Sequence, residues 1–153
     1  MRFLRMLLND GEVDGLRILI SDMVSLLKQN HIGDVGGGRA IPSAMPGLSG
    51  EFTFIDDGRD TWGIGFQITT AAVPGKRSPG SPGWGGIFNT FYWLDPEREV
   101  AGVILMQSLP FVDPRDLQVY DIFERGESTM KGRRGAVCVL HGLPRLNHGC
   151  ASR

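Results

Sequence analysis

The segment from Gly83 to Gln107 constrains the fold of this chain more than any other part of it. Residues 84–94 read Trp-Gly-Gly-Ile-Phe-Asn-Thr-Phe-Tyr-Trp-Leu, and residues 100–107 are almost as apolar. They are separated by Asp95-Pro96-Glu97-Arg98, and Asp at the first and Pro at the second position of a four-residue turn favour type I geometry. We therefore predict an antiparallel hairpin with strands at about residues 84–94 and 99–107.

Apolar side chains alternate onto both faces of this predicted hairpin. In the first strand one face would carry Trp84, Phe88, Tyr92 and Leu94, and the other would carry Ile87, Phe91 and Trp93. A strand that is apolar on both faces lies in a sheet covered on both sides. We therefore predict an α+β fold in which helices flank an antiparallel sheet. The helices are expected near residues 2–9, 22–30 and 115–125.

The sequence Gly83-Trp84-Gly85-Gly86 on such a hairpin resembles the third motif of serine hydrolases with the class C β-lactamase fold. The resemblance is strongest to the esterase branch, the family VIII carboxylesterases. Residues 2–9, residues 11–19 and the run Trp62-Gly63-Ile64-Gly65-Phe66 agree with that group in order and spacing. The resemblance extends from Arg2 to about Glu124, which is the C-terminal part of the family's domain, and it implies an incomplete class C β-lactamase-like fold.

The chemistry of the resembled family needs a Ser-x-x-Lys nucleophile motif, a Tyr-x-Asn motif and the third motif. By resemblance, Trp84, Gly85 and Gly86 would line the acyl pocket, and the backbone N–H of Ile87 would be one of two oxyanion-hole donors. Glycine suits this position because a β-carbon would block close approach to a main-chain donor. The resemblance thus implies hydrolysis of an ester or amide through an acyl-enzyme. With only the third motif present, this chain is expected to be catalytically incomplete.

The sequence leaves two alternatives to the serine hydrolase interpretation open. The glycine-rich segment could be a bulged strand entry that buries Trp84 and has no role in catalysis. The chain could also be a noncatalytic protein-interaction module that uses its aromatic hairpin as a binding surface. Recovered hydrolysis of an aryl ester on mixing with an N-terminal half would separate the enzyme from the module.

The run Ser25-Leu26-Leu27-Lys28 matches Ser-x-x-Lys, but helix signals explain it. Ser21 with Asp22 is typical of a helix start, and Lys28 falls in the last turn, where a cation suits the helix dipole. We therefore assign no nucleophile. Both tyrosines, Tyr92 and Tyr120, are predicted to be packing residues whose hydroxyls reach solvent, and neither is expected to be a catalytic base.

Glycine-rich loops are expected at residues 34–50 and 73–82. Gly36-Gly37-Gly38-Arg39 lacks the Gly-Lys-Ser/Thr ending of a phosphate-binding loop and has no strand before it, so a surface loop is favoured over a nucleotide site. Gly47-Leu48-Ser49-Gly50 lacks the spacing of a nucleophile elbow. We predict no cofactor.

The last part of the chain differs in character from residues 1–125, which form the predicted hydrolase-like domain. In residues 126–153 five basic residues oppose Glu127 alone, so this segment carries a net charge of +4. A basic, disordered tail is the first interpretation, and translation out of the original reading frame is another. Cys138-x-x-His141 with His148-x-Cys150 would suit zinc in residue type, but the single-residue gap departs from common spacings. No metal site and no specific nucleic-acid surface are therefore predicted.

Composition bounds the remaining possibilities. The chain has 153 residues, 41% of them hydrophobic and 22% charged, and no apolar run approaches twenty residues. We therefore expect no membrane-spanning segment and no signal peptide. A cytoplasmic location is the default expectation. The expected partners are a small ester or amide substrate and either the missing N-terminal part of the hydrolase domain or a second copy of the chain.

Overall fold

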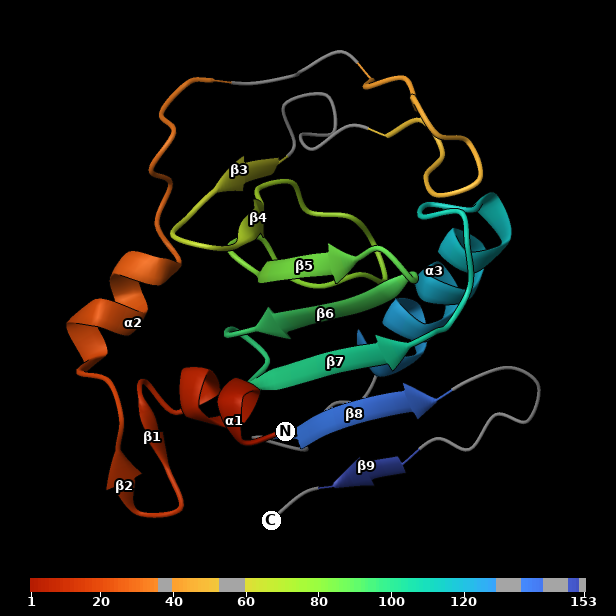
Figure 1. Ribbon diagram of the computed structural model, residues 1–153. Coiled ribbons are helices and arrows are strands. Elements are labelled where there is room, and N and C mark those ends of the chain that lie inside the picture. The colour runs from red at the N-terminus through yellow and green to blue at the C-terminus, as the bar shows by residue number, and fades with distance from the viewer. Residues whose placement is uncertain (36–39, 53–59, 129–135, 142–148, 152–153) are drawn as a thin grey trace.

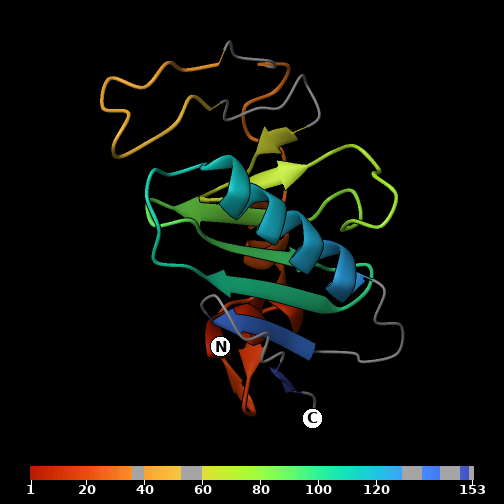
Figure 2. The same cartoon turned by 90° about the vertical axis from the view of Figure 1, so that its right-hand side faces the viewer.

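The computed structural model describes residues 1–35, 40–52, 60–128, 136–141 and 149–151 of the chain. Within these residues one mixed sheet forms the centre of the molecule, with α3 across one face and α1 on the other (Figures 1 and 2). The sheet order is β3-β4-β5-β6-β7-β8-β9, and all neighbours are antiparallel except β7 and β8. The strands are β3 Asp60–Trp62, β4 Gln67–Thr69, β5 Pro82–Gly86, β6 Thr90–Asp95, β7 Val100–Leu105, β8 Ala136–His141 and β9 Gly149–Ala151.

The helices lie where the sequence predicts them, and the predicted α+β class is confirmed. They are α1 Arg2–Leu8, α2 Ser21–Leu27 and α3 Pro114–Ser128. A two-stranded hairpin of β1 Glu12–Val13 and β2 Leu16–Arg17 connects α1 to α2. No helix within the described residues is long and apolar enough to cross a membrane.

The prediction of a single strand over residues 84–94 is wrong, because a turn divides this segment. β5 ends at Gly86 and β6 begins at Thr90. The N–H of Asn89 donates to the carbonyl of Gly86 over 3.0 Å, and Asn89 has a φ of +57°. A three-residue loop whose last residue is left-handed is a common hairpin connection, and Asn tolerates that conformation. Ile87 and Phe88 therefore occupy the exposed turn and do not face the core as predicted.

The predicted hairpin turn after β6 is confirmed. β6 and β7 pair in the register Leu94↔Ala101 and Asp95↔Val100. The buried carboxylate of Asp95 accepts hydrogen bonds from the N–H of Arg98, at 3.0 Å, and from the N–H of Ser78, at 2.8 Å. Asp95 therefore fixes the turn and also anchors the loop that precedes β5.

Both faces of the central strands are buried, as the alternation on β6 and β7 predicts. On one face Trp93 packs with Val100 and the α3 residue Tyr120. On the other face Leu94 and Val103 belong to the same core cluster as Leu4, Met6 and Leu7 of α1. Because the two apolar faces have separate helical covers, α1 and α3 together hold β5–β7 in a fixed position.

Two strands occupy the segment in which we expected a disordered tail. β8 pairs with β7 over six residue pairs, from Val100↔Ala136 to Leu105↔His141, and β9 pairs with β8. The expectation of disorder is wrong for these strands. β7 is apolar on both faces, and one of its edges would be unpaired without β8. The valines of β8 suit a strand at that edge. Cys138 is disulfide-bonded, so it is not a thiolate available to zinc; His148 lies outside the described residues.

Candidate functional site

The glycine-rich strand β5 has one paired edge and one open edge. Its inner edge pairs with β6 from Gly83 to Gly86, including Trp84↔Tyr92 and Gly85↔Phe91. Its outer edge pairs with β4 only at Pro82 and Gly83. At Gly85 and Gly86 the outer edge has no strand partner within the described part of the chain. Such an edge presents main-chain N–H and C=O groups that can bind an extended ligand or a developing oxyanion.

The absence of a side chain at Gly85 is required by packing. A β-carbon there would lie 2.7 Å from two ring atoms of Phe91, which is closer than van der Waals contact allows. Gly85 thus lets the Phe91 ring lie directly over the strand. Trp84 is half-buried and packs edge-on against Trp62, with ring centroids 4.7 Å apart.

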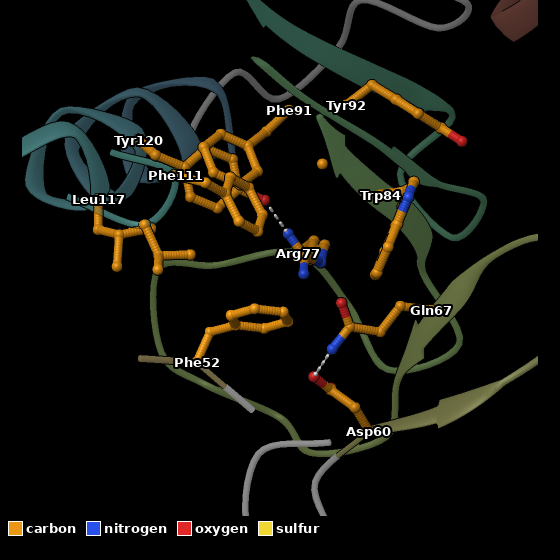
Figure 3. Close-up of a pocket in the computed structure, with 13 residues that line it drawn as sticks. Phe52, Asp60, Gln67, Arg77, Trp84, Phe91, Tyr92, Phe111, Leu117 and Tyr120 are labelled. Atoms are coloured by element: carbon orange, nitrogen blue, oxygen red, sulfur yellow. Dashed lines mark hydrogen bonds between the residues drawn. The ribbon is translucent and has the colours of Figure 1, made fainter. Parts of the chain in front are cut away.

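A cavity of about 430 Å³ lies along β5, next to α3 (Figure 3). Aromatic rings form one side of it: Phe91 stacks on Tyr120 at 4.6 Å, and Phe111 meets Phe52 edge-on at 5.6 Å. The other side is polar and contains Arg77. The lining residues are Phe52, Asp60, Gln67, Arg77, Gly83, Trp84, Gly85, Phe91, Tyr92, Phe111, Val112, Leu117 and Tyr120.

Arg77 connects the loop before β5 to α3. Its Nη1 donates to the hydroxyl of Tyr120 at 2.5 Å and to the carboxylate of Glu124 at 3.1 Å, and its Nε donates to Thr69 Oγ1 at 3.0 Å. Burial opposes the charge of the guanidinium, but its interactions with Tyr120 and Glu124 outweigh this effect, so the pKa of Arg77 is raised. Arg77 is therefore a fixed cation at neutral pH.

Both tyrosines pack against other aromatic rings, as predicted, but the hydroxyl of Tyr120 differs from the prediction. Tyr120 is a packing residue, but its hydroxyl accepts a hydrogen bond from Arg77 and does not reach out into solvent. Burial raises the pKa of Tyr120, and Arg77 only partly opposes this effect. Tyr92 packs edge-on against Phe66, at 6.2 Å, and burial raises its pKa as well. Both phenols are thus protonated at neutral pH.

Asn89 connects the turn after β5 to the far wall of the cavity. Its buried Nδ2 donates to the carbonyl of Pro110, at 2.8 Å, and to the carboxylate of Asp116, at 3.0 Å. Its Oδ1 accepts from the N–H of Val112 at 2.8 Å. The side chain therefore sets the position of the loop that contributes Phe111 and Val112 to the cavity.

The structure brings only some of the predicted site residues together. Trp84 and Gly85 line the cavity, whereas Gly86 and Ile87 do not belong to its lining. Ile87 is in the exposed turn directly after the open edge. Their proposed roles in the acyl pocket and oxyanion hole stay predictions. Ser25 lies on α2, as predicted, and Lys28 is the C-cap that follows this helix and does not belong to its last turn.

Sequence reasoning missed the polar side of the cavity, namely Arg77, Gln67 and Asp60. Arg77 follows Lys76 in a loop rich in Gly and Pro, and its partner Glu124 is 47 residues away. No local pattern joins residues at that separation. Within the described residues no group of three or more His, Cys, Asp or Glu side chains could hold a metal ion.

Comparison with known proteins identifies the family. The family model "Beta-lactamase" matches residues 4–127, so the chain belongs to the beta-lactamase family, as the sequence resemblance predicts. Among curated proteins the chain is similar to Protein Rv1367c and to Uncharacterized protein MT1414, from two strains of Mycobacterium tuberculosis. Each is 28% identical over 117 residues, covering 72% of this chain and 26% of the relative.

Solved structures support the same fold. Simvastatin Synthase (LovD) from Aspergillus terreus, unliganded, aligns with a TM-score of 0.58 and 19% identity in one crystal structure and 0.56 and 21% in another. These alignments cover 85% and 82% of this chain, but 33% and 32% of LovD. The chain therefore spans about a quarter of its curated relatives and a third of these structures.

Proposed function

We propose that this chain is the C-terminal portion of a serine hydrolase that cleaves an ester or amide through an acyl-enzyme. The Ser-x-x-Lys nucleophile and the Tyr-x-Asn motif would come from a segment outside these 153 residues. The observation that carries the proposal is the open outer edge of β5 at Gly85 and Gly86, within a chain of the beta-lactamase family. The short span of the chain relative to its relatives supports it further.

In this proposal β5 supplies stabilisation and the second segment supplies the nucleophile. The serine oxygen attacks the substrate carbonyl, and the negative charge moves onto the carbonyl oxygen. The N–H of Ile87 and the N–H of the serine would donate to that oxygen, as main-chain donors do in oxyanion holes. The Asn89 hydrogen bonds that fix the turn would keep the Ile87 donor in place.

An exposed apolar surface offers a place for the second segment. It extends over α1, the β1–β2 hairpin and the start of α2, which lie side by side in Figure 1. Its members are about half exposed or more: Phe3, Leu16, Ile18, Ile20 and Met23. Phe3, Leu16 and Ile18 line one shallow pocket, and exposed apolar surface of this kind marks interaction sites. We infer that the rest of the hydrolase domain covers it.

A complementation experiment tests the proposal. The chain would be mixed with a second polypeptide, taken from a full-length member of the family, that carries the Ser-x-x-Lys and Tyr-x-Asn motifs the proposal requires. We expect hydrolysis of p-nitrophenyl butyrate only in the mixture, and none when the motif's serine is replaced by alanine. A stable complex that does not hydrolyse the ester, or activity that survives the serine substitution, would contradict the proposal.

The alternative of a noncatalytic module that binds through its aromatic hairpin is less well supported. Trp93 is fully buried beneath α3, and Tyr92 packs against Phe66. Only Ile87 and Phe88, in the turn, expose large apolar side chains on this hairpin. The packing therefore favours the hydrolase proposal.

A further inference from the structure

Arg77 has an unused hydrogen-bond donor at the cavity over β5. Its Nε and Nη1 are engaged with Thr69, Tyr120 and Glu124, whereas its Nη2 has no hydrogen-bond partner within the described residues. In Figure 3 the guanidinium lies between the aromatic rings and Gln67. Because three hydrogen bonds fix the group, binding an acceptor at Nη2 would cost little conformational entropy.

The aromatic side of the cavity offers rigid apolar surface. Phe111 lies between Phe91, with which it stacks at 6.1 Å, and Phe52, which meets it edge-on at 5.6 Å. Figure 3 shows Phe52 across the open space from Phe111 and Leu117. Aromatic rings bind further planar rings in both stacked and edge-on geometry. A ligand with an aromatic ring therefore fits this side.

The charges around the cavity favour a neutral ligand over an anion. The Arg77 cation is paired with Glu124, whose side chain is only 2% exposed and also lies 3.8 Å from Lys76 Nζ. On the far side of the cavity the carboxylate of Asp60 accepts a hydrogen bond from Gln67 Nε2 at 2.7 Å. A ligand carboxylate at the Arg77 donor would thus lie beside the carboxylate of Glu124, whereas a neutral carbonyl oxygen could accept from that donor without this repulsion.

We propose that this cavity is a binding site for a neutral molecule that combines a planar aromatic ring with a carbonyl oxygen, such as an aryl-substituted amide. The ring lies against Phe52 and Phe111, and the carbonyl oxygen accepts from Arg77 Nη2. The volume of about 430 Å³ is within the range of small-molecule sites. Binding needs only residues of this chain, so the inference does not depend on the proposed hydrolase activity.

The test uses the full 153-residue chain and two probes that share a ring. Phenylacetamide is neutral and phenylacetate is anionic. In a ¹H–¹⁵N NMR titration that includes the Arg77 Nε–H signal, we expect saturable shifts with phenylacetamide and a Kd on the order of 1 mM, typical for so small a ligand. Phenylacetate should bind at least about tenfold more weakly. An absence of saturable shifts, or phenylacetate binding as tightly, would overturn the proposal.

Two substitutions in α3 locate the site. Leu117→Trp fills the cavity from its rim, and Ile122→Trp adds the same side chain to a residue of α3 that is 62% exposed and does not line the cavity. Thermal melts followed by circular dichroism establish that both variants fold. We expect Leu117→Trp to weaken phenylacetamide binding by roughly tenfold or more, with Ile122→Trp unchanged. Equal affinity in the two folded variants would place any binding elsewhere and overturn the assignment.

A third substitution tests the donor. Arg77→Lys retains a cation for Glu124 but removes the planar group that presents Nη2 to the cavity. Phenylacetamide binding should weaken by roughly tenfold, while the Leu117 and Phe111 methyl and ring signals still shift at saturating probe. Unchanged affinity in Arg77→Lys would show that no hydrogen bond from Nη2 holds the ligand.

Discussion

The side-chain amide of Asn89 lies 3.0 Å from the carboxylate of Asp116, so the turn after β5 is bonded directly to the first turn of α3. The same amide also holds the chain between them, through Pro110 and Val112. One buried side chain thus positions both the end of the glycine-rich strand and the aromatic loop opposite it.

Two substitutions at Asn89 distinguish the stability that its side-chain hydrogen bonds contribute from the cost of its left-handed backbone conformation. Asn89→Gly keeps the left-handed φ accessible but leaves buried groups without partners, and we expect a loss of about 2 kcal/mol or more in unfolding free energy. Asn89→Ala loses the same bonds and adds roughly 1 kcal/mol of backbone strain. Urea denaturation measures both. If the alanine variant were as stable as the glycine variant, the φ of +57° would carry no cost.

Ile87 allows the oxyanion-hole proposal to be tested by removing one main-chain N–H. Ile87 is the second residue of the turn that begins at Gly86, a position that proline favours in type I turns. In the complemented hydrolase, Ile87→Pro should lower kcat by about 10²–10³-fold, the usual effect of losing one oxyanion donor. Ile87→Ala retains the N–H and serves as the control. Similar kcat values for both variants would exclude this donor.

The burial of the two tyrosines predicts that the chain loses stability at alkaline pH. Burial raises the pKa of both Tyr92 and Tyr120, so each contributes stability that is present below its unfolded pKa of about 10 and is lost as the pH rises through the folded value. Absorbance at 295 nm should show phenolate formation only above about pH 10 in the folded chain, and near pH 10 in urea. Ionisation of a folded tyrosine below that pH would contradict the burial of its hydroxyl.

Ending the chain after Ser128 tests the role of β8 and β9. The truncation leaves the edge of β7 unpaired from Val100 to Leu105, and unprotected apolar edges associate with one another. We expect a lower melting temperature and self-association in sedimentation velocity, compared with the full chain. A monomeric truncated chain that melts at the same temperature would show that β8 adds nothing to the sheet.

Local sequence signals predicted the elements that local interactions determine. The helix near residues 115–125 and the turn at Asp95 follow from short-range patterns, and both are present. The turn at residues 87–89 was missed because Ile87 and Phe88 are apolar, and their alternation imitates a strand that continues to Leu94. Only Asn89, which tolerates a left-handed φ, marked the break.

Long-range contacts explain the other differences. Arg77 is placed by Tyr120 and Glu124, which are 43 and 47 residues away, so nothing near it in the sequence indicated a cavity. β8 was missed for a related reason. The net charge of residues 126–153 suggested a solvated tail, whereas the apolar run of β8 finds its partner only in β7.

The parallel pairing of β7 with β8 also bears on the order in which the chain folds. β5, β6 and β7 are joined by short turns and can pair soon after collapse, because their contacts are local. β8 cannot join them until α3, the crossover between β7 and β8, has docked on the sheet. We therefore expect a refolding intermediate in which the antiparallel core is protected from hydrogen exchange while the last strands still exchange freely.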